Sequence, residues 1–337
     1  MNAEIFAEWM RRQGQRVIRT QSSYWYDAGM RVFQAFPYHW LIQPTEKELR
    51  YLLLRHGIVA LRYSTPLESA TGRVSYHVVL KKPYNMEMLR HQARNNIRRG
   101  LRQCQIEHIS FERLAKEGWL LQQDTLDRQG RSGGMSEQDW SRICLSARDL
   151  PGFEAWGAIV EGELAATLLT TRIDDTCYVP YAQCYQKYLN LRVNNALFYV
   201  ASCEMLSREG VNGIFFSLHS LDAPESVNEF KFRMSFIPKP VRQRIVFNPV
   251  CMPLVNATSH KIIARWLQRD PGNYILSKAE GMLRFYLQGI RPIEAQDWPA
   301  CLEPGKEDFL NSREFNKPEP VTEIERHDRI AEMQVDS

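Results

Sequence analysis

Lys231 is the residue of this sequence whose type and surroundings most directly suggest chemistry. It stands between two aromatic residues, in the stretch Phe230-Lys231-Phe232. A cation held among apolar side chains can stabilise negative charge that develops on a carbonyl oxygen, or bind a phosphate. Lys231 is therefore a candidate catalytic and cofactor-binding residue. The alternative interpretation is a surface lysine on an amphipathic helix.

Three residues near Lys231 could act as a general base. His219 and Asp222 follow the short apolar run 213–218, which predicts a buried strand. In open α/β sheets, ligands bind beyond the carboxyl ends of the strands, so both side chains are candidates. Glu229 is the third candidate. For His219, a solvated loop histidine is the alternative.

Another group of candidates lies at the start of a predicted helix. From 194 to 209, apolar residues recur at helical spacing, and Gly210 stands where a cap glycine belongs. Arg192, Asn194 and Asn195 lie where free N–H groups and the helix dipole favour an anion. They are therefore candidates to bind a phosphate or an acyl carbonyl of a cofactor. Asn194 is also a good N-cap, and both roles can hold together because they use the same helix end.

Arginines recur every fourth residue in a predicted basic helix at 85–104, which places them on one face. Like-charge repulsion disfavours such a stripe unless anions meet it, so it could bind tRNA, a nucleotide-bearing substrate or an acidic partner. The alternative is a solvated face countered by nearby glutamates. No aromatic residues are interleaved for base stacking, which argues against a dedicated nucleic-acid domain. The arginines are Arg90, Arg94, Arg98, Arg99 and Arg102, and the glutamates are Glu107, Glu112 and Glu117.

A polar segment at 124–134 ends in glycines at 130, 133 and 134. It predicts either a loop that covers a substrate or a plain connector. Thr125, Arg128 and Gln129 are its candidate substrate-binding residues. It is not a nucleotide-binding loop, because no apolar strand precedes it and the required lysine is lacking.

The elements that must position these residues can be followed from 154 to 247. Breaks at Glu161-Gly162-Glu163 and Asp174-Asp175 separate three apolar runs, which predicts a meander of three strands. The predicted order is then strand, strand, strand, helix, strand, helix, strand. The segments are 154–160, 164–174, 176–185, 194–209, 213–218, 225–236 and 242–247.

The flanking regions predict further helices and strands. Thr45 and Glu48 predict a capping box, which opens a helix that Gly57 ends. Beyond Pro299 the Glu-, Pro- and Lys-rich sequence predicts a flexible tail. The remaining expectations are strands at 58–63, 75–80 and 105–109, and helices at 137–148 (capped by Ser136), 259–268 and 277–288.

This order of elements resembles the GNAT acyltransferase fold. The sequence of 194–236, with the segments NNAL, GIFFSL and VNEFKFRMSF, resembles the FemAB-like branch. Residues 94–100 resemble its basic helix and 125–130 a loop that follows, which adds Arg94 and Arg98 to the candidate substrate contacts. The resemblance implies an α/β protein with a mixed sheet and two GNAT-like subdomains in tandem. The expected divisions are 1–84, 85–250, a helical extension at 251–298 and the tail at 299–337.

The resemblance implies an N-acyltransferase, and three departures bear on its donor. Arg192 and Asn194 stand where acyl-CoA-using members carry glycines, and Ser235 replaces a glycine before Phe236. Lys231 stands where many CoA-dependent members carry a Tyr general acid. Acyl-CoA, such as acetyl-CoA, is the expected donor, with aminoacyl-tRNA as the alternative. The acceptor would be a small-molecule or cell-envelope precursor amine. A non-catalytic, GNAT-shaped anion- or RNA-binding protein is the third possibility.

The bulk composition is that of an ordinary globular protein. The chain has 337 residues, 44% of them hydrophobic and 24% charged, with a formal net charge of +4, too small to indicate nucleic-acid binding by itself. Seven cysteines include no CxxC pair, which predicts reduced thiols, no metal site and a cytoplasmic location. No apolar run approaches the ~20 residues that a membrane span requires, and the first residues do not suggest a signal peptide.

Overall fold

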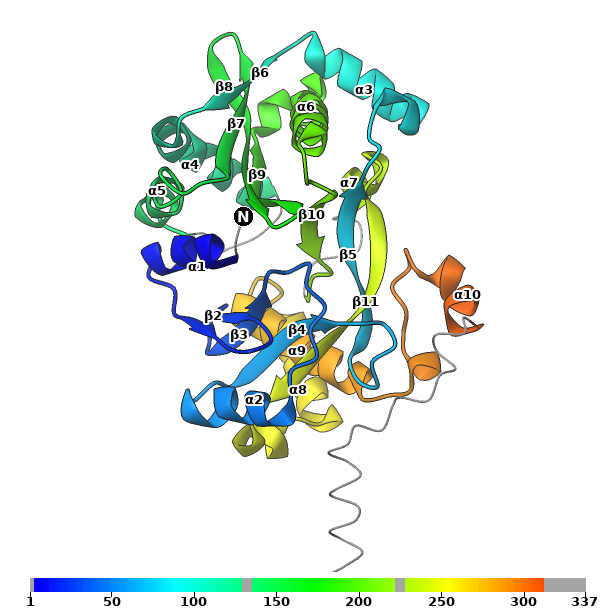
Figure 1. The fold of residues 1–337 in the computed structure, drawn as a ribbon. Coiled ribbons are helices and arrows are strands. Elements are labelled where there is room, and N and C mark those ends of the chain that lie inside the picture. Colours follow the sequence, from blue (N-terminus) through cyan, green and yellow to red (C-terminus); the bar gives the residue numbers. More distant parts are fainter. Residues whose placement is uncertain (1–2, 129–134, 222–227, 312–337) are drawn as a thin grey trace, which may run out of the picture. The chain divides into compact units, whose positions relative to one another are not determined.

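A computed structural model of the chain describes residues 3–128, 135–221 and 228–311. Asp222 and Gln129, two of the candidate site residues, lie outside these ranges. The described residues up to Pro299 belong to one unit, and those from Ala300 to a second. The first unit is a mixed α/β structure around one large sheet, which confirms the predicted fold class (Figure 1).

Eleven strands form this sheet in the described residues, in the order β1-β2-β3-β4-β11-β5-β10-β9-β8-β7-β6. The predicted meander is present as β7, β8 and β9, which pair antiparallel in sequence order. The strands are β1 Val17–Arg19, β2 Tyr24–Asp27, β3 Val32–Phe36, β4 Ala60–Thr65, β5 Arg73–Lys81, β6 Gln105–Ile109, β7 Phe153–Val160, β8 Glu163–Ile173, β9 Thr176–Cys184, β10 Gly213–Leu218 and β11 Ile237–Phe247.

Helices cover the sheet, with α4 and α6 on opposite sides of the meander (Figure 1). In the first unit they are α1 Ala3–Arg12, α2 Glu46–Arg50, α3 His91–Leu101, α4 Phe111–Arg128, α5 Glu137–Leu145, α6 Val193–Ser207, α7 Glu229–Arg233, α8 Ala257–Arg269 and α9 Tyr274–Gly289. The second unit contains α10, Lys306–Asn311, within the segment predicted as a tail. The boundaries between the expected subdomains stay predictions.

The predicted caps can be checked directly. Ser136 forms a complete capping box with Asp139 at the start of α5. Thr45 caps α2 by accepting from the Glu48 N–H, but the Glu48 carboxylate accepts instead from the N–H and hydroxyl of Ser22. The reciprocal half of that predicted box is therefore wrong, because a long-range partner takes the Glu48 side chain.

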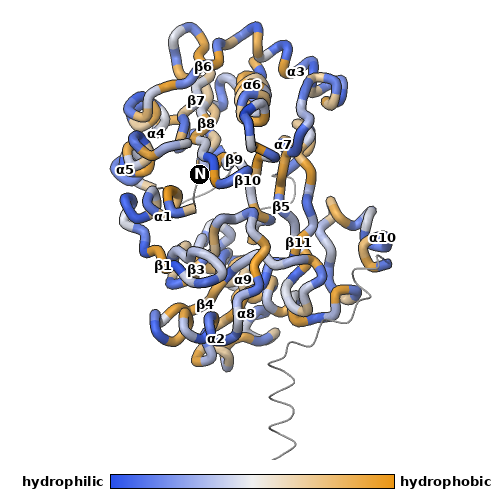
Figure 2. The backbone as a smooth tube through the Cα atoms, in the orientation of Figure 1, coloured by the Kyte–Doolittle hydropathy of each residue, from blue (hydrophilic) through white to orange (hydrophobic). Residues whose placement is uncertain are grey.

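Strand β11 brings a late part of the sequence into the same sheet as the early strands β4 and β5. It lies between β4 and β5 and pairs antiparallel with both, although nearly 160 residues separate β5 from β11. On its other edge β5 pairs with β10. Side chains from β4 and β5, early in the sequence, thereby reach the carboxyl end of β10. Figure 2 shows apolar and polar residues mixed along these central strands.

A close contact between α3 and α6 sets the position of the α6 N-terminus. A Cβ atom at Gly100 would overlap the Arg192 carbonyl oxygen and lie 2.9 Å from the Ala196 Cβ. We expect Gly100→Ala to lower the free energy of unfolding by about 1–3 kcal/mol, because the two helices must separate. Asn95→Ala, at an exposed position of the same helix, is the control. Urea unfolding measures both variants, and equal stabilities would contradict the expectation.

Candidate active site

A cleft of about 600 Å³ opens where β9 and β10 diverge. The two strands pair in parallel from Gly213 to Phe215 against Thr176 to Tyr178. Beyond these pairs, residues 179–184 of β9 and 216–220 at the end of β10 line the cleft. Five candidate site residues lie on its walls, and we refer to it as the Lys231 cleft. They are Thr125, Arg128, Asn194, His219 and Lys231.

Lys231 is held in the wall of this cleft by defined partners. It is 9% exposed, so the surface-lysine interpretation is wrong. Its Nζ donates to Asn228 Oδ1 at 2.8 Å and to Ser217 Oγ at 3.3 Å, and it lies 4.2 Å from the Phe216 ring centroid. Two acceptors and an aromatic face are the partners that a lysine ammonium group takes in proteins. Lys231 therefore presents a fixed positive charge beside the cleft.

His219 lies at the end of β10, and it is buried rather than solvated. It is 7% exposed, its ring stacks on Tyr76 at 4.6 Å, and its Nδ1 lies 3.1 Å from Ser75 Oγ. Burial, together with the nearby charges of Arg73, Arg62 and Arg284, lowers its pKa from 6.5 to about 3. The imidazole is therefore neutral at pH 7. A base of such low pKa accepts a proton weakly, so His219 is better suited to a hydrogen-bonding role.

The start of α6 meets the cleft through Asn194. Helix α6 begins at Val193 after Arg192, whose carbonyl accepts from the N–H groups of Asn195 and Ala196. Asn195 Nδ2 lies 3.5 Å from the Met234 sulfur, so its side chain ties α6 to the end of α7. The Arg192 side chain is exposed.

Arg192 and Ser235, which stand at glycine positions of the resembled family, both take the left-handed conformation. Their φ angles are each +66°. Arg192 and Ser235 thus adopt the backbone conformation that glycine takes easily. For a residue with a side chain, this conformation costs roughly 1–2 kcal/mol of folding free energy.

We expect Arg192→Gly to raise the free energy of unfolding by about 0.5–1 kcal/mol, because the relief of strain exceeds the entropy cost of glycine. Arg208→Gly, at the extended residue after α6, should lower stability and serves as the control. Chemical denaturation of both variants checks this, and a destabilised Arg192→Gly protein would contradict it.

Thr125 and Arg128 line the cleft from a helix, and their prediction as part of a loop is wrong. They belong to the last turns of α4. Thr125 Oγ1 accepts from the Cys184 N–H at 3.2 Å, and Arg128 Nη1 donates to the Cys184 carbonyl at 3.1 Å. These bonds fix α4 to the divergent end of β9. The buried positions 114, 115, 118, 121, 122 and 125 of α4 follow helical spacing, a signal that the polar composition of its end concealed.

Five other described candidates do not line this cleft: Arg192 and Asn195, which flank Asn194 at the start of α6, and Glu229, Arg94 and Arg98. Glu229 is exposed and forms an ion pair with Arg233 at 2.5 Å. Arg94 and Arg98 lie on α3 and line neither this cleft nor the neighbouring one.

The glutamates that could have countered the arginine stripe pair elsewhere. Glu107 and Glu117 bind Arg113, and Glu112 binds Arg148. In the described residues, no ion-pair partner is found for Arg90, Arg94, Arg98, Arg99 or Arg102.

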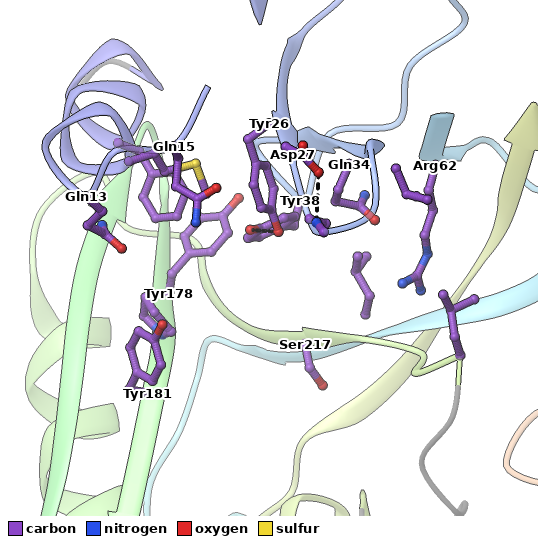
Figure 3. A pocket seen from close by; sticks show the side chains of 18 of the residues that line it. Gln13, Gln15, Tyr26, Asp27, Gln34, Tyr38, Arg62, Tyr178, Tyr181 and Ser217 are labelled. Carbon is purple, nitrogen blue, oxygen red and sulfur yellow. Dashed lines mark hydrogen bonds between the residues drawn. The ribbon is translucent and has the colours of Figure 1, made fainter. Parts of the chain in front are cut away.

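A larger cleft of about 920 Å³ adjoins the first and shares part of its wall. Five tyrosines line it, and we refer to it as the tyrosine cleft; they are Tyr26, Tyr38, Tyr178, Tyr181 and Tyr274. The Tyr38 hydroxyl donates to the Tyr26 hydroxyl at 2.9 Å. In Figure 3, Ser217 lies between the tyrosines of β9 and Arg62 of β4. Because Arg62, Tyr181 and Ser217 line both clefts, the two spaces meet at the Lys231 partner Ser217.

Several residues of the site were not predicted from the sequence. Ser217 and Asn228 lie inside the stretches that carry the family resemblance, and their polar types next to apolar neighbours are the signal that was available. Asn228 also donates to the Tyr76 hydroxyl at 2.9 Å, which links Lys231 to β5. Arg62 and Tyr76 had no local signal, because their approach depends on strand pairing across the chain.

No cluster of three or more His, Cys, Asp or Glu side chains suited to a metal ion occurs among the described residues. Within the same part of the chain, every helix is too short or too polar to cross a membrane.

At the level of sequence, no protein-family model and no curated protein matches the chain. Among solved structures, FemX matches with a TM-score of 0.52, over 74% of this chain and 93% of FemX, at 10% identity. L-PGS from Bacillus licheniformis matches with a TM-score of 0.47, over 75% of this chain and 95% of that one, at 13% identity. A tandem GNAT protein from the clavulanic acid biosynthesis pathway matches with a TM-score of 0.41, over 69% and 82%, at 10% identity.

The match to FemX concerns the arrangement of the backbone, since so few residues are identical. In this chain the meander, α6, β10, α7 and β11 follow one another in the order expected from the sequence. The chain therefore has a fold like that of FemX, in agreement with the resemblance seen in the sequence.

Proposed function

We propose that this protein is an N-acyltransferase that moves an acyl group from an activated donor to an amine. The observation that carries the proposal is the Lys231 ammonium, fixed by Asn228 and Ser217 in the cleft between the divergent ends of β9 and β10. A preorganised cation at such a place stabilises an oxyanion better than water does, because it need not reorient during the reaction.

In this proposal the donor and the acceptor bind in the two adjoining clefts. The donor lies in the Lys231 cleft, with its phosphate or carbonyl at the α6 start beside Asn194, and with Arg192 and Asn195 flanking it. The acceptor amine enters through the tyrosine cleft and meets the acyl carbon near Ser217. As the nitrogen attacks, the carbonyl oxygen becomes negative and Lys231 stabilises it; collapse of the tetrahedral species expels the donor's leaving group.

The amine must lose one proton in this reaction. His219 faces the cleft as a neutral ring, so it can orient the amine by a hydrogen bond even though its low pKa makes it a weak base. Asp222 follows β10 by four residues in the sequence and stays the candidate carboxylate. Glu229, outside both clefts, is the less favoured candidate.

The donor is the second part of the proposal. We favour acyl-CoA, because the α6 start retains the left-handed turn that lets N–H groups approach a phosphate. Aminoacyl-tRNA is the rival donor, and a specific observation favours it. The arginine stripe of α3 lacks ion-pair partners in the described residues, and α3 packs against α6 near the cleft. Thr125, Arg128 and Gln129 would then contact the acceptor or the acyl group. A cytoplasmic location fits either donor.

Thermal unfolding with a panel of donors tests the proposal. The panel is acetyl-CoA, longer acyl-CoAs and bulk aminoacyl-tRNA, each at about 100 times its Kd, where a shift of ~2.7 kcal/mol in stability is expected. A shift with acyl-CoA that Asn194→Ala reduces supports the favoured donor. A shift with aminoacyl-tRNA that weakens steeply with salt and with Arg94→Gln/Arg98→Gln supports the rival. Binding of RNA without turnover would instead make this a GNAT-shaped binding protein, and no shift with any donor would refute the donor site.

A further inference from the structure

The segment from 250 to 275 carries an unusual concentration of exposed apolar side chains. Of the sixteen large hydrophobic residues that are exposed in the described part of the chain, seven fall within it. Single exposed hydrophobic residues need no explanation, but such a concentration marks an interaction surface. The seven are Val250, Met252, Leu254, Ile262, Trp266, Tyr274 and Ile275, of which Tyr274 also lines the tyrosine cleft.

Helix α8 forms the outermost layer of this segment. It packs against α9, which itself packs on β5 and β11, and none of its side chains is buried. Figure 1 shows α8 at the lower edge of the first unit. Ile262 and Trp266 are 42% and 53% exposed, and their spacing of four residues places them side by side on one face of the helix.

Cations share this face, and acids are lacking from the helix. Lys261, Arg265 and Arg269 are exposed neighbours of Ile262 and Trp266. No Asp or Glu occurs in the α8 sequence ATSHKIIARWLQR. Among the described residues, none of the three cations has an ion-pair partner. We define the α8 face by these three cations with Ile262 and Trp266.

The composition of the α8 face indicates what kind of partner it binds. Exposed Trp and Ile beside unpaired cations, on a helix without acids, is the composition of helices that lie in a membrane interface. Tryptophan favours the headgroup level, where its ring is apolar and its N–H finds acceptors. Lys and Arg gain from the negative potential of anionic phospholipids.

We propose that the α8 face binds the protein peripherally to membranes that contain anionic phospholipids. Ile262 and Trp266 would enter the boundary between headgroups and acyl chains, while Lys261, Arg265 and Arg269 contact lipid phosphates. This proposal does not depend on acyl transfer.

Co-sedimentation of the full chain with vesicles tests it. We expect binding to phosphatidylglycerol–phosphatidylcholine vesicles and little to phosphatidylcholine alone. Lys261→Gln/Arg265→Gln/Arg269→Gln should lower the partition coefficient on the order of 100-fold, and Ile262→Ser/Trp266→Ser about tenfold. Leu120→Ser, which removes a 56% exposed side chain from α4, is the matched control and should change nothing.

Three outcomes would overturn the proposal. One is failure of the wild-type chain to bind anionic vesicles. Another is binding that the α8 variants leave unchanged, because other surfaces would then be responsible. The third is a change of oligomeric state in the α8 variants without vesicle binding, which would make the α8 face an interface between copies of the chain.

Discussion

Replacement of Lys231 by methionine should lower kcat/KM for acyl transfer about 10²–10³-fold, the usual loss when one preorganised oxyanion donor is removed. Methionine has a similar length and can pack against Phe216, so the fold should survive. Asn228 and Ser217 would lose their common donor but can turn toward water in the cleft. The measurement is transfer from whichever donor raises the melting temperature, followed under single-turnover conditions so that chemistry is separated from product release.

Lys116→Met provides the matched control for this variant. It removes an exposed lysine from α4, so transfer and stability should match the wild-type values. Circular dichroism of both variants establishes that the fold is retained. Asn228→Ala should reduce transfer less than Lys231→Met, because Ser217 and Phe216 still hold the ammonium. A Lys231→Met protein that transfers within threefold of the wild-type rate would remove Lys231 from the mechanism.

Mild acid should destabilise the protein strongly, because His77 and His219 are buried as neutral rings. Burial is the main cause that lowers the pKa of each from 6.5 to about 3. Between pH 6.5 and 3 the unfolded chain therefore binds more protons than the folded one, and stability falls as the pH falls. The contribution is complete above pH 6.5. From pH 7 to 5 each histidine should cost about 2 kcal/mol, or about 4 kcal/mol together.

Neighbouring groups reinforce this effect. Positive charges add to burial: Lys239 and Arg62 for His77, and Arg73, Arg62 and Arg284 for His219. His39, whose pKa is lowered to about 4 mainly by burial, should add a similar loss over the same range. Carboxyl groups titrate mostly below pH 5, so the range from pH 5 to 7 isolates the histidines.

Urea unfolding at pH 7, 6 and 5 measures the acid effect. His77→Gln and His219→Gln should each reduce the loss of stability between pH 7 and 5 by about 2 kcal/mol, whatever they do to the stability at pH 7. His91→Gln is the control, because His91 is exposed on α3. A pH dependence that is the same in all four proteins would show that both rings are reached by protons in the folded state.

Local sequence signals were enough for the elements around Lys231. The charged breaks at 161–163 and 174–175 lie at the turns of the β7–β9 meander, and Gly210 takes a left-handed conformation after α6. Such turns and caps depend on a few neighbouring residues, so they can be predicted without the fold. The polar end of α4 was mistaken for a loop because local composition outweighed helical spacing.

The sequence by itself determined the order of the elements around Lys231, because periodicity and breaks act over a few residues. The predicted N-cap role of Asn194 was wrong, since Arg192 occupies the N-cap of α6. Only the tertiary structure decided that β11 lies between β4 and β5, which brings Arg62 and Tyr76 to the Lys231 cleft. It likewise decided the pairing of charges and the burial that keeps His219 neutral. Strand pairing and burial depend on contacts between residues far apart in the chain, so they cannot be predicted from a short stretch of sequence.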